Sequence, residues 1–233
     1  MKLLTVVIPC FNEVDSLPKL ILQLSAINND IEFLLINNGS TDGSKTYLEN
    51  IDLKPNISVL HISNNEGYGH GVYTGLKSIS NSKFLGWIHG DLQFEFDKLE
   101  KLYIDLKKLS PFDDNIFYKG VRSKRNFLDK LFSKLMEIFA TLILGEKFHE
   151  INAQPTIFSR DLLSSIENPP KDFSFDTYIY WLALKKNYKI VREKFLFPKR
   201  EYGKSNWNFG LRSRISFGIL LIKYFIKLSK LNN

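Results

Sequence analysis

Cysteine is almost absent from this chain of 233 residues, and the single Cys10 excludes an internal disulfide. No group of cysteines and histidines has the spacing of a zinc site, so we expect a reducing compartment, the cytoplasm. Charge-free stretches are shorter than the roughly 18 to 20 residues that a transmembrane helix needs. Residues 1–9 are too short and too rich in β-branched side chains for a secretory leader, and we interpret them as the first strand.

Two common nucleotide-binding motifs are also missing. The chain has no Walker A lysine motif, and no G-x-G-x-x-G follows the first predicted strand. Both absences argue against a P-loop NTPase and against a dinucleotide-dependent enzyme. The nearest approach, GYGHG at residues 67–71, follows the third predicted strand instead.

The chain does have a basic balance of charge and enough apolar residues for a core. Hydrophobic residues make up 44% of the sequence, which supports a folded domain of this length. The net charge of +7 and the pI near 9.3 indicate an anionic partner. Nucleotide phosphates, nucleic acid and membrane headgroups all satisfy this condition, and the sign of the charge alone does not separate them.

Four apolar runs alternate with amphipathic stretches in the first part of the chain. The runs cover residues 3–8, 31–36, 57–62 and 84–88. This repeat of strand and helix predicts an α/β fold with a mostly parallel central sheet flanked by helices. A polar segment follows each run, and because parallel strands end at one edge of the sheet, we expect the four segments to lie together.

The second part of the chain is less regular. We predict helices over residues 98–109, 128–144 and 175–186 and strands over residues 115–121 and 188–197, with irregular structure elsewhere. No repeat or low-complexity linker interrupts the chain. We therefore predict a single domain over residues 1–210, with a nucleotide-binding half (1–92) and an acceptor half (93–210), followed by an amphipathic helix within residues 211–233.

The polar segment after the fourth run is the most informative one. His89, Asp91 and Gln93 offer an imidazole nitrogen, a carboxylate and an amide oxygen within five residues. Such a set can hold a divalent cation that keeps its other positions for phosphate oxygens and water. The alternative interpretation is an ordinary polar turn between a strand and a helix.

Small hydrogen-bonding residues crowd the segment after the second run, NNGSTDGS at residues 37–44. Glycines let the backbone approach a ligand, and helix N-terminal amides favour anions. A helix-capping turn would also use Ser, Thr and Asp, but it needs fewer of them. We therefore favour ligand binding by Asn37 and Asn38.

Four motifs occur in a recognisable order: VIPCFNE at residues 7–13, INNGSTDG at 36–43, NNEG at 64–67 and DLQ at 91–93. This order resembles the nucleotide-binding half of family-2 glycosyltransferases with the GT-A fold. In detail it is similar to the polyprenyl-phosphate glycosyltransferases of the dolichyl-phosphate mannosyltransferase type. The resemblance is good over about residues 3–95 and loose over the remainder.

The resemblance implies how a nucleotide-sugar donor is bound. Pro9, Phe11 and Glu13 stand where that family holds the nucleoside, and Gly67 belongs to the third matching motif. Asn38 stands where the family usually has an aspartate that faces the base.

The resemblance also implies a divalent cation, which Asp91 and Gln93 would bind together with the diphosphate of the donor. Two departures from the family pattern affect this expectation. The usual D-x-D has become His89-Gly90-Asp91, and the paired aspartates of the second motif have become Asn37-Asn38. Imidazole is a better ligand for Mn²⁺ than for Mg²⁺, so either ion remains open.

A basic segment far along the chain, REYGKS at residues 200–205, suits a phosphate. Arg200, Lys204 and Ser205 match an R-x-x-G-x-S motif of the similar enzymes, which closes over the diphosphate or the acceptor phosphate. Arg122 and Arg125 follow a predicted strand, where they are placed to help. Taken singly, each cation is more simply a solvated surface residue. As a set we assign them to phosphate and acceptor binding, and Arg200 to catalysis as well.

A catalytic base is needed only for some acceptors. A hydroxyl must lose its proton in the transition state, whereas a lipid phosphate is already anionic near neutral pH. Asp176 lies where hydroxyl-using relatives of the resemblance carry a catalytic aspartate, although a carboxylate at a helix start is also stabilised by the helix dipole. Glu150 is a weaker candidate.

Basic and apolar residues recur at helical spacing near the C-terminal end. Lys223, Lys227 and Lys230 stand among the aromatic and aliphatic residues of segment 215–231. This pattern is typical of a helix that lies on a membrane surface. The predicted helix 128–144 is a candidate for a second contact, although core packing is the simpler interpretation there.

Our leading hypothesis is an inverting glycosyltransferase that uses Mn²⁺ or Mg²⁺ and moves a sugar from a nucleotide sugar to a polyprenyl phosphate. It would be peripheral at the inner, cytoplasmic face of the cell membrane. An alternative acceptor is a hydroxyl of a lipid-linked or cell-surface glycan, with Asp176 as base. A protein without catalysis is a further alternative: one that binds a nucleotide sugar, motivated by His89, or one that binds nucleic acid, motivated by the basic balance of charge. We expect no nucleic-acid partner, because the aromatic residues follow core periodicity and no recognition helix appears.

Overall fold

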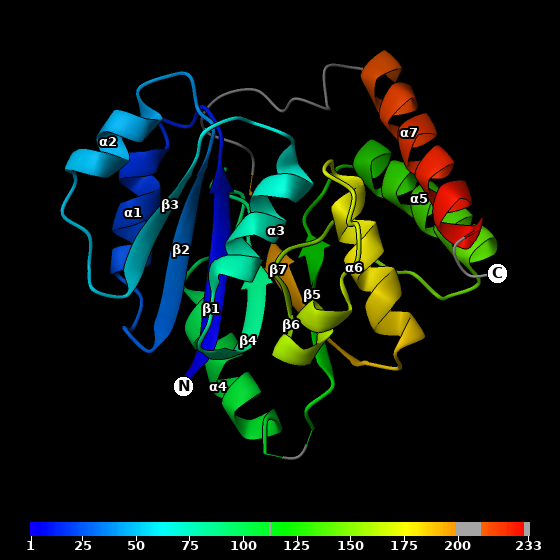
Figure 1. Cartoon of the computed structure of the whole chain (residues 1–233). Helices are drawn as coiled ribbons and strands as arrows, with labels where there is room; N and C mark the ends of the chain where they lie inside the picture. The colour runs from blue at the N-terminus through cyan, green and yellow to red at the C-terminus, as the bar shows by residue number, and fades with distance from the viewer. Residues whose placement is uncertain (112, 199–210, 231–233) are drawn as a thin grey trace.

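A mostly parallel seven-stranded sheet forms the centre of the computed structural model, which describes residues 1–111, 113–198 and 211–230 (Figure 1). The strands lie in the order β3-β2-β1-β4-β6-β5-β7, and β6 is antiparallel to both of its neighbours. Their bounds are β1 Lys2–Cys10, β2 Ile31–Asn38, β3 Ile57–Ile62, β4 Ser82–Trp87, β5 Ile116–Ser123, β6 Thr156–Ser159 and β7 Lys189–Leu196.

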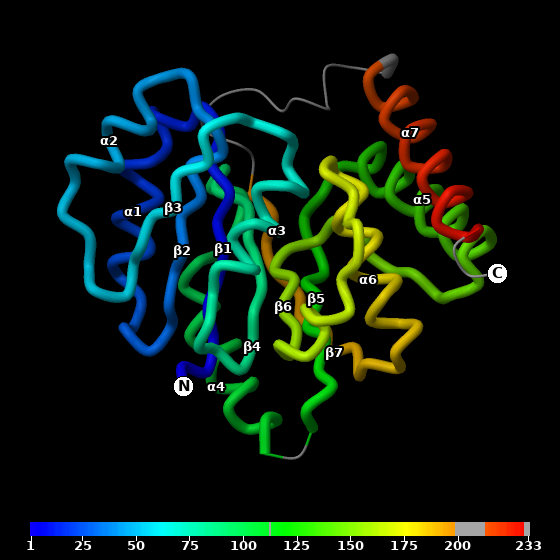
Figure 2. Tube along the Cα trace, in the orientation of Figure 1, coloured from blue at the N-terminus to red at the C-terminus, as the bar shows by residue number. Residues whose placement is uncertain are grey.

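Helices cover both faces of this sheet (Figures 1 and 2). One face packs against α1 Leu17–Ser25, α2 Ser44–Asn50 and α4 Lys98–Leu109. The other packs against α3 Tyr68–Ser78, the 3₁₀ helix Arg160–Ser165, α5 Phe127–Leu144, α6 Ser174–Lys185 and α7 Leu211–Ser229. The tube in Figure 2 shows that α5 and α7 lie at the end of the molecule opposite α1 and α2.

Alternating side chains of the central strands enter the two halves of the core. In β1, Val6 belongs to the cluster beneath α1 and α4, whereas Val7 belongs to the cluster beneath α3 and α6. Both are fully buried. A strand covered on both faces needs a continuous apolar run, which is why these strands stand out in the sequence.

The predicted α/β fold with its mostly parallel sheet is confirmed. The helix predicted over residues 98–109 agrees with α4 at both ends. The interpretation of the region after residue 144 as largely irregular is wrong for β6, which pairs with β4 and β5. Four residues are too few for a period to be recognised, and their pairing partners are distant in the sequence. The division into halves 1–92 and 93–210 stays a prediction.

The C-terminal helix α7 packs alongside α5. Leu221, Phe225 and Leu228 of α7 are buried in the core, so one side of this helix is an ordinary packing surface. Contact of this helix with a membrane surface stays a prediction for its other side. Within the described ranges, no helix combines the length and the apolar character needed to cross a membrane.

Close contact between β5 and the segment before β6 yields a test of packing. A Cβ on Gly120 would lie 1.9 Å from the Gln154 carbonyl oxygen, and Gly120 N donates to Pro155 O at 2.9 Å. We expect Gly120→Ala to lower the free energy of unfolding by about 1–3 kcal/mol, measured by urea denaturation. Gly218→Ala in α7 is the matched control, because its nearest neighbour atom would be at 3.4 Å. Equal losses in both variants would contradict this account.

Candidate active site

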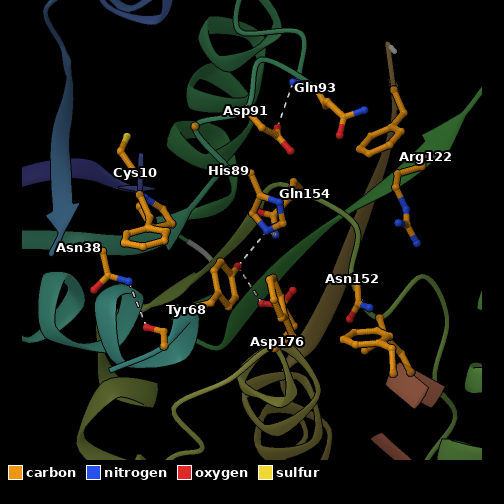
Figure 3. Close-up of a pocket in the computed structure, with 18 of the residues that line it drawn as sticks. Cys10, Asn38, Tyr68, His89, Asp91, Gln93, Arg122, Asn152, Gln154 and Asp176 are labelled. Carbon is orange, nitrogen blue, oxygen red and sulfur yellow. Dashed lines mark hydrogen bonds between the residues drawn. The ribbon is translucent and has the colours of Figure 1, made fainter. Parts of the chain in front are cut away.

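One cavity of about 350 Å³ opens where the central strands end (Figure 3). The ends of β1 and β4, the starts of α3 and α6 and the segment before β6 contribute its polar wall. Many of the predicted site residues line it: Pro9, Phe11, Glu13, Asn38, Gly67, His89, Asp91, Gln93, Arg122 and Asp176. This convergence makes the cavity the candidate active site.

The turn after β1 is held against the turn after β2. Glu13 N donates to Ser44 Oγ at 3.1 Å, and the Glu13 carboxylate accepts a hydrogen bond from Ser16 Oγ at 2.7 Å. Phe11 is 36% exposed and lines the cavity, so its ring offers a surface on which a planar ligand can stack.

The Asp91 carboxylate stands in a tight turn after β4. Asp91 Oδ1 accepts a hydrogen bond from Gln93 N at 3.1 Å, and Gln93 Nε2 donates to Pro198 O at 2.9 Å. Leu92, between them, has a φ of 60°, which is uncommon for leucine, and its side chain is buried. Burial of this side chain holds the turn that carries Asp91 at the cavity wall.

Asp91 and Gln93 fit a divalent cation that is shared with a ligand. In the described part of the chain, no lysine or arginine pairs with Asp91, so its charge lacks a compensating cation there. The same residues include no group of three His, Cys, Asp or Glu side chains that could hold a metal ion. One carboxylate and one amide leave most coordination positions to phosphate oxygens and water, as is common for Mg²⁺.

His89 belongs to a hydrogen-bonded group on another wall of the cavity (Figure 3). Its Nε2 lies 2.9 Å from the Tyr68 hydroxyl and 3.1 Å from Gln154 Nε2. The Tyr68 hydroxyl in turn donates to Asp176 Oδ1 at 3.2 Å. Protein groups therefore engage Nε2 of His89, and metal binding by His89, which stays a prediction, would use its other ring nitrogen.

Asp176 is buried at the start of α6, with 2% of its surface exposed. Burial raises the pKa of Asp176, while the charges of Lys119 and His89 oppose that rise. Lys119 of β5 is also fully buried, and its Nζ donates to Thr156 Oγ1 at 2.6 Å. A carboxylate with a raised pKa at a cavity wall is a better proton acceptor than an exposed one.

Arg122 and Arg125 both pair with Glu150. Arg122 Nε lies 2.7 Å from Glu150 Oε2, and Arg125 NH1 lies 3.4 Å from Glu150 Oε1. Arg125 also donates to Asp129 O at 2.9 Å and to Ser133 Oγ at 2.7 Å. Of the two arginines, Arg122 lines the cavity and Arg125 does not. The Arg125 guanidinium anchors the start of α5, and its assignment to phosphate binding stays a prediction.

The two asparagines at the end of β2 point in different directions. Asn38 Nδ2 donates to Gly67 O at 3.1 Å, and its buried Oδ1 has no hydrogen-bond partner among the described residues. Asn37 Nδ2 lies 3.0 Å from His61 Nδ1, and Asn37 Oδ1 accepts from Ser40 N at 3.2 Å. Asn38 thus lines the cavity with a side chain whose oxygen is buried and, within the described ranges, unpaired. Successive strand residues face opposite sides, so Asn37 does not line this cavity, and its contact with the nucleotide stays a prediction.

Arg200, Lys204 and Ser205 lie outside the described residues, so their assignment to phosphate binding stays a prediction. The residues that precede this segment do reach the cavity. Phe197 lines it, and Pro198 O accepts the hydrogen bond from Gln93.

The sequence interpretation missed two features of the site. Tyr68, Asn152 and Gln154 line the polar wall, and an apolar end is formed by Phe132 and Met136 of α5 with Phe217 and Leu221 of α7. Tyr68 could have been predicted from the sequence, since it directly follows Gly67 of the third matching motif. The apolar end could not be predicted from the sequence, because it depends on how α5 and α7 pack.

Comparison with known proteins identifies the family. The model for glycosyl transferase family 2 matches residues 5–167. The chain belongs to glycosyl transferase family 2. It is therefore a glycosyltransferase, and its sheet and helices form the GT-A fold.

Curated relatives match most of this glycosyltransferase. It is 26% identical to an uncharacterized protein of Methanocaldococcus jannaschii, over 80% of this chain and 84% of that protein. It is 21% identical to polyprenol monophosphomannose synthase of Mycolicibacterium smegmatis, over 86% and 79%. It is 23% identical to an undecaprenyl-phosphate 4-deoxy-4-formamido-L-arabinose transferase of Enterobacter sp., over 88% of this chain but only 62% of that protein.

Solved structures share the fold at low sequence identity. Glucosyl-3-phosphoglycerate synthase from Mycobacterium tuberculosis matches with a TM-score of 0.70 and 15% identity, over 97% of this chain and 80% of that one. A mannosyltransferase from Pyrobaculum calidifontis, in complex with GDP-Man and Mn²⁺, matches with a TM-score of 0.60 and 16% identity, over 98% and 73%.

The buried Lys119 predicts a pH dependence of stability. Burial lowers the pKa of Lys119 to about 8 from an ordinary value of 10.5, so between these values the unfolded chain binds more protons than the folded one. The buried charge of Lys119 destabilises the folded state fully below pH 8. This destabilisation is lost as the pH rises toward 10.5. Relative to Lys119→Met, we expect the wild-type free energy of unfolding to rise by about 2 kcal/mol from pH 8 to 10 in urea denaturation.

The exposed Lys108 offers a matched control for this experiment, since Lys108→Met removes a lysine without removing a buried charge. It should leave the pH dependence of the wild type unchanged. The same pH dependence in the wild type and Lys119→Met would contradict the prediction.

Proposed function

We propose that this glycosyltransferase moves a sugar, with inversion at the anomeric carbon, from a nucleotide sugar to a polyprenyl phosphate at a membrane surface. The observation that carries the proposal is the composition of one cavity. Arg122 and the carboxylate of Asp91, which is proposed to hold a divalent cation, line its polar part, and Phe132, Met136, Phe217 and Leu221 line an apolar end. An acceptor with an anionic head and a hydrocarbon chain matches this division.

The names of two relatives support the same class of acceptor. One is a polyprenol monophosphomannose synthase, and another is an undecaprenyl-phosphate transferase. Both names refer to a sugar and to a polyprenyl carrier that bears a phosphate. We infer the cytoplasmic, membrane-peripheral location of this chain from the same acceptor.

On the donor side, Phe11 and Asn38 are proposed to hold the base, together with Pro9, Glu13 and Gly67. The exposed ring of Phe11 suits stacking, and Asn38 lines the same cavity with a polar side chain. Asp91 and Gln93 would hold a divalent cation, Mn²⁺ or Mg²⁺. The structures of two similar proteins contain Mn²⁺ with a nucleotide ligand, which supports this choice.

In the proposed reaction an acceptor oxygen attacks the anomeric carbon while the nucleoside diphosphate leaves from the opposite side. The cation would neutralise charge that develops on the leaving diphosphate. Arg200 and Lys204 are proposed to act on the same charge. A lipid phosphate attacks as an anion, so no residue of the chain has to remove a proton from it.

Asp91→Asn tests the donor site. The variant keeps the size of the side chain but removes its charge, so we expect turnover to fall at least about a hundredfold. Sugar transfer from a panel of labelled nucleotide sugars to a polyprenyl phosphate, with Mn²⁺ or Mg²⁺, measures the effect. Asp97→Asn is the matched control, because Asp97 is exposed at the start of α4. Full activity of Asp91→Asn would remove the proposed role of Asp91.

A second candidate acceptor is a hydroxyl of a lipid-linked or cell-surface glycan. The observation that favours it is Asp176, a buried carboxylate with a raised pKa at the wall of the same cavity. Such a group is suited to take the proton of an attacking hydroxyl. A lipid phosphate would leave Asp176 with a structural role, as acceptor of the Tyr68 hydrogen bond.

Asp176→Asn separates the two acceptors. The amide can still accept a hydrogen bond from Tyr68, but it cannot serve as a base. With a phosphate acceptor we expect the rate to change less than about tenfold, and with a hydroxyl acceptor to fall by about 10²–10⁴. Thermal melting of the variant verifies that it is folded. A collapse of transfer to polyprenyl phosphate in a folded variant would count against the phosphate acceptor.

A further inference from the structure

An outer side of α5 exposes an unusual number of large apolar residues. They are spaced three or four residues apart, or adjacent, and therefore share one side of the helix. Leu128 and Leu142 are 64% and 76% exposed. The row consists of Leu128, Leu131, Leu135, Ile138, Phe139 and Leu142.

The neighbouring helix α7 extends this apolar surface. Gly218 of α7 faces Phe132 and Met136 of α5, which fixes the line of contact between the helices. Ile215 and Ile222 stand three and four residues from Gly218, on the side away from the buried Leu221. The apolar row of α7 consists of Ile215, Ile219, Ile222 and Ile226, of which Ile222 is half-buried.

Figure 1 shows α5 and α7 side by side at the end of the molecule away from α1. Phe139, three residues after Met136, borders the same line of contact from the α5 side. The two rows therefore meet and form one apolar surface, which we name the α5–α7 face.

Lysines border the α5–α7 face on both of its outer edges. Lys130 and Lys134 follow the apolar row around α5, and Lys223, Lys227 and Lys230 follow the row around α7. No carboxylate stands at an exposed position of the described parts of these helices. Glu137 is buried and pairs with Lys134 at 3.2 Å, and Asp129 pairs with Arg214 at 2.9 Å.

From this distribution we propose that the α5–α7 face docks on the surface of an anionic lipid bilayer, with its isoleucines, leucines and phenylalanine in the interfacial region and the lysines among the headgroups. Charge complementarity selects this occupant over a second copy of the chain. A symmetric pair would bring the lysine borders of two copies together, and like charges repel. The inference rests on the proposed function only for its setting, a membrane that carries the acceptor.

The α5–α7 face lies next to the cavity, so docking would bring the cavity close to the bilayer. Phe132 and Met136 of α5, and Phe217 and Leu221 of α7, line the apolar end of the cavity from the inner sides of the same two helices. A bilayer on the outer sides is therefore separated from the cavity by one layer of helices. An acceptor chain leaving the bilayer beside these helices would have a short way to the Asp91 side of the cavity.

Co-flotation of the purified full chain with lipid vesicles tests the proposal without donor or acceptor. Vesicles of equimolar phosphatidylcholine and phosphatidylglycerol are compared with vesicles of phosphatidylcholine alone. Leu135→Glu/Leu142→Glu alters the apolar row, and Lys223→Gln/Lys227→Gln/Lys230→Gln alters one border. The matched control is Leu22→Glu/Ile104→Glu, which changes two exposed apolar residues of α1 and α4.

We expect the wild type and the control to float with the anionic vesicles, and the leucine variant to lose binding to both kinds of vesicle at least tenfold. The lysine variant should lose up to about a hundredfold of its binding to anionic vesicles, at roughly fivefold for each lysine. Circular dichroism verifies that every variant is folded.

Failure of the wild type to float, or equal losses in the control and the leucine variant, would overturn the proposal. So would a wild-type dimer in solution that Leu135→Glu/Leu142→Glu dissociates while vesicles leave it unbound, because the face would then cover a second copy. Flotation without sugar transfer would reject the proposed function and keep the docking surface. Sugar transfer to a dispersed acceptor without flotation would keep the proposed function and reject the docking surface.

Discussion

The parallel pairing of β1 with β2 on one side and β4 on the other is the constraint on which the site depends. Ile88 N donates to Val7 O at 3.0 Å, so β4 ends close to the level at which β1 ends. Cys10 is opposite Asn37 in the register with β2. A Cβ on Gly90 would lie 3.0 Å from Cys10 Sγ, so the two turns are in contact. Hydrogen bonds between strands thus bring together polar residues that are up to 80 positions apart in the chain.

The charges around the cavity are arranged in two ways. Deep groups compensate one another: Lys119 lies near Asp176, and Glu150 pairs with two arginines. Asp91, in contrast, has no cationic partner in the described ranges. Compensated charges hold their positions without a ligand, because each offsets the cost of burying the other. An uncompensated carboxylate at a cavity wall instead favours a cationic ligand. The folded chain therefore determines where in the cavity a cation is attracted.

The sequence was sufficient for every strand except β6, for α4 and for the cavity residues that stand at strand ends. Continuous apolar runs and short turns are local properties, and their order then fixes the edge at which polar residues meet. The contacts of Asn37 and Arg125 could not be predicted from the sequence, because each depends on a partner elsewhere in the chain, His61 and Glu150 respectively. The strand β6 was not predicted for a related reason. Its hydrogen bonds are made to β4 and β5, and its own four residues are too few to show a hydrophobic period.

Glu137 lies on the inner side of α5 and accepts a hydrogen bond from Glu150 N at 2.7 Å, so this helix supports the residue that holds Arg122 at the cavity. The leucines of its outer side are a different set of positions, separated from Glu137 by the helical period. The outer side of α5 can therefore change in sequence without disturbing Arg122 at the cavity. Substitutions of the outer leucines are expected to leave the contacts of Glu150 with Arg122 unchanged.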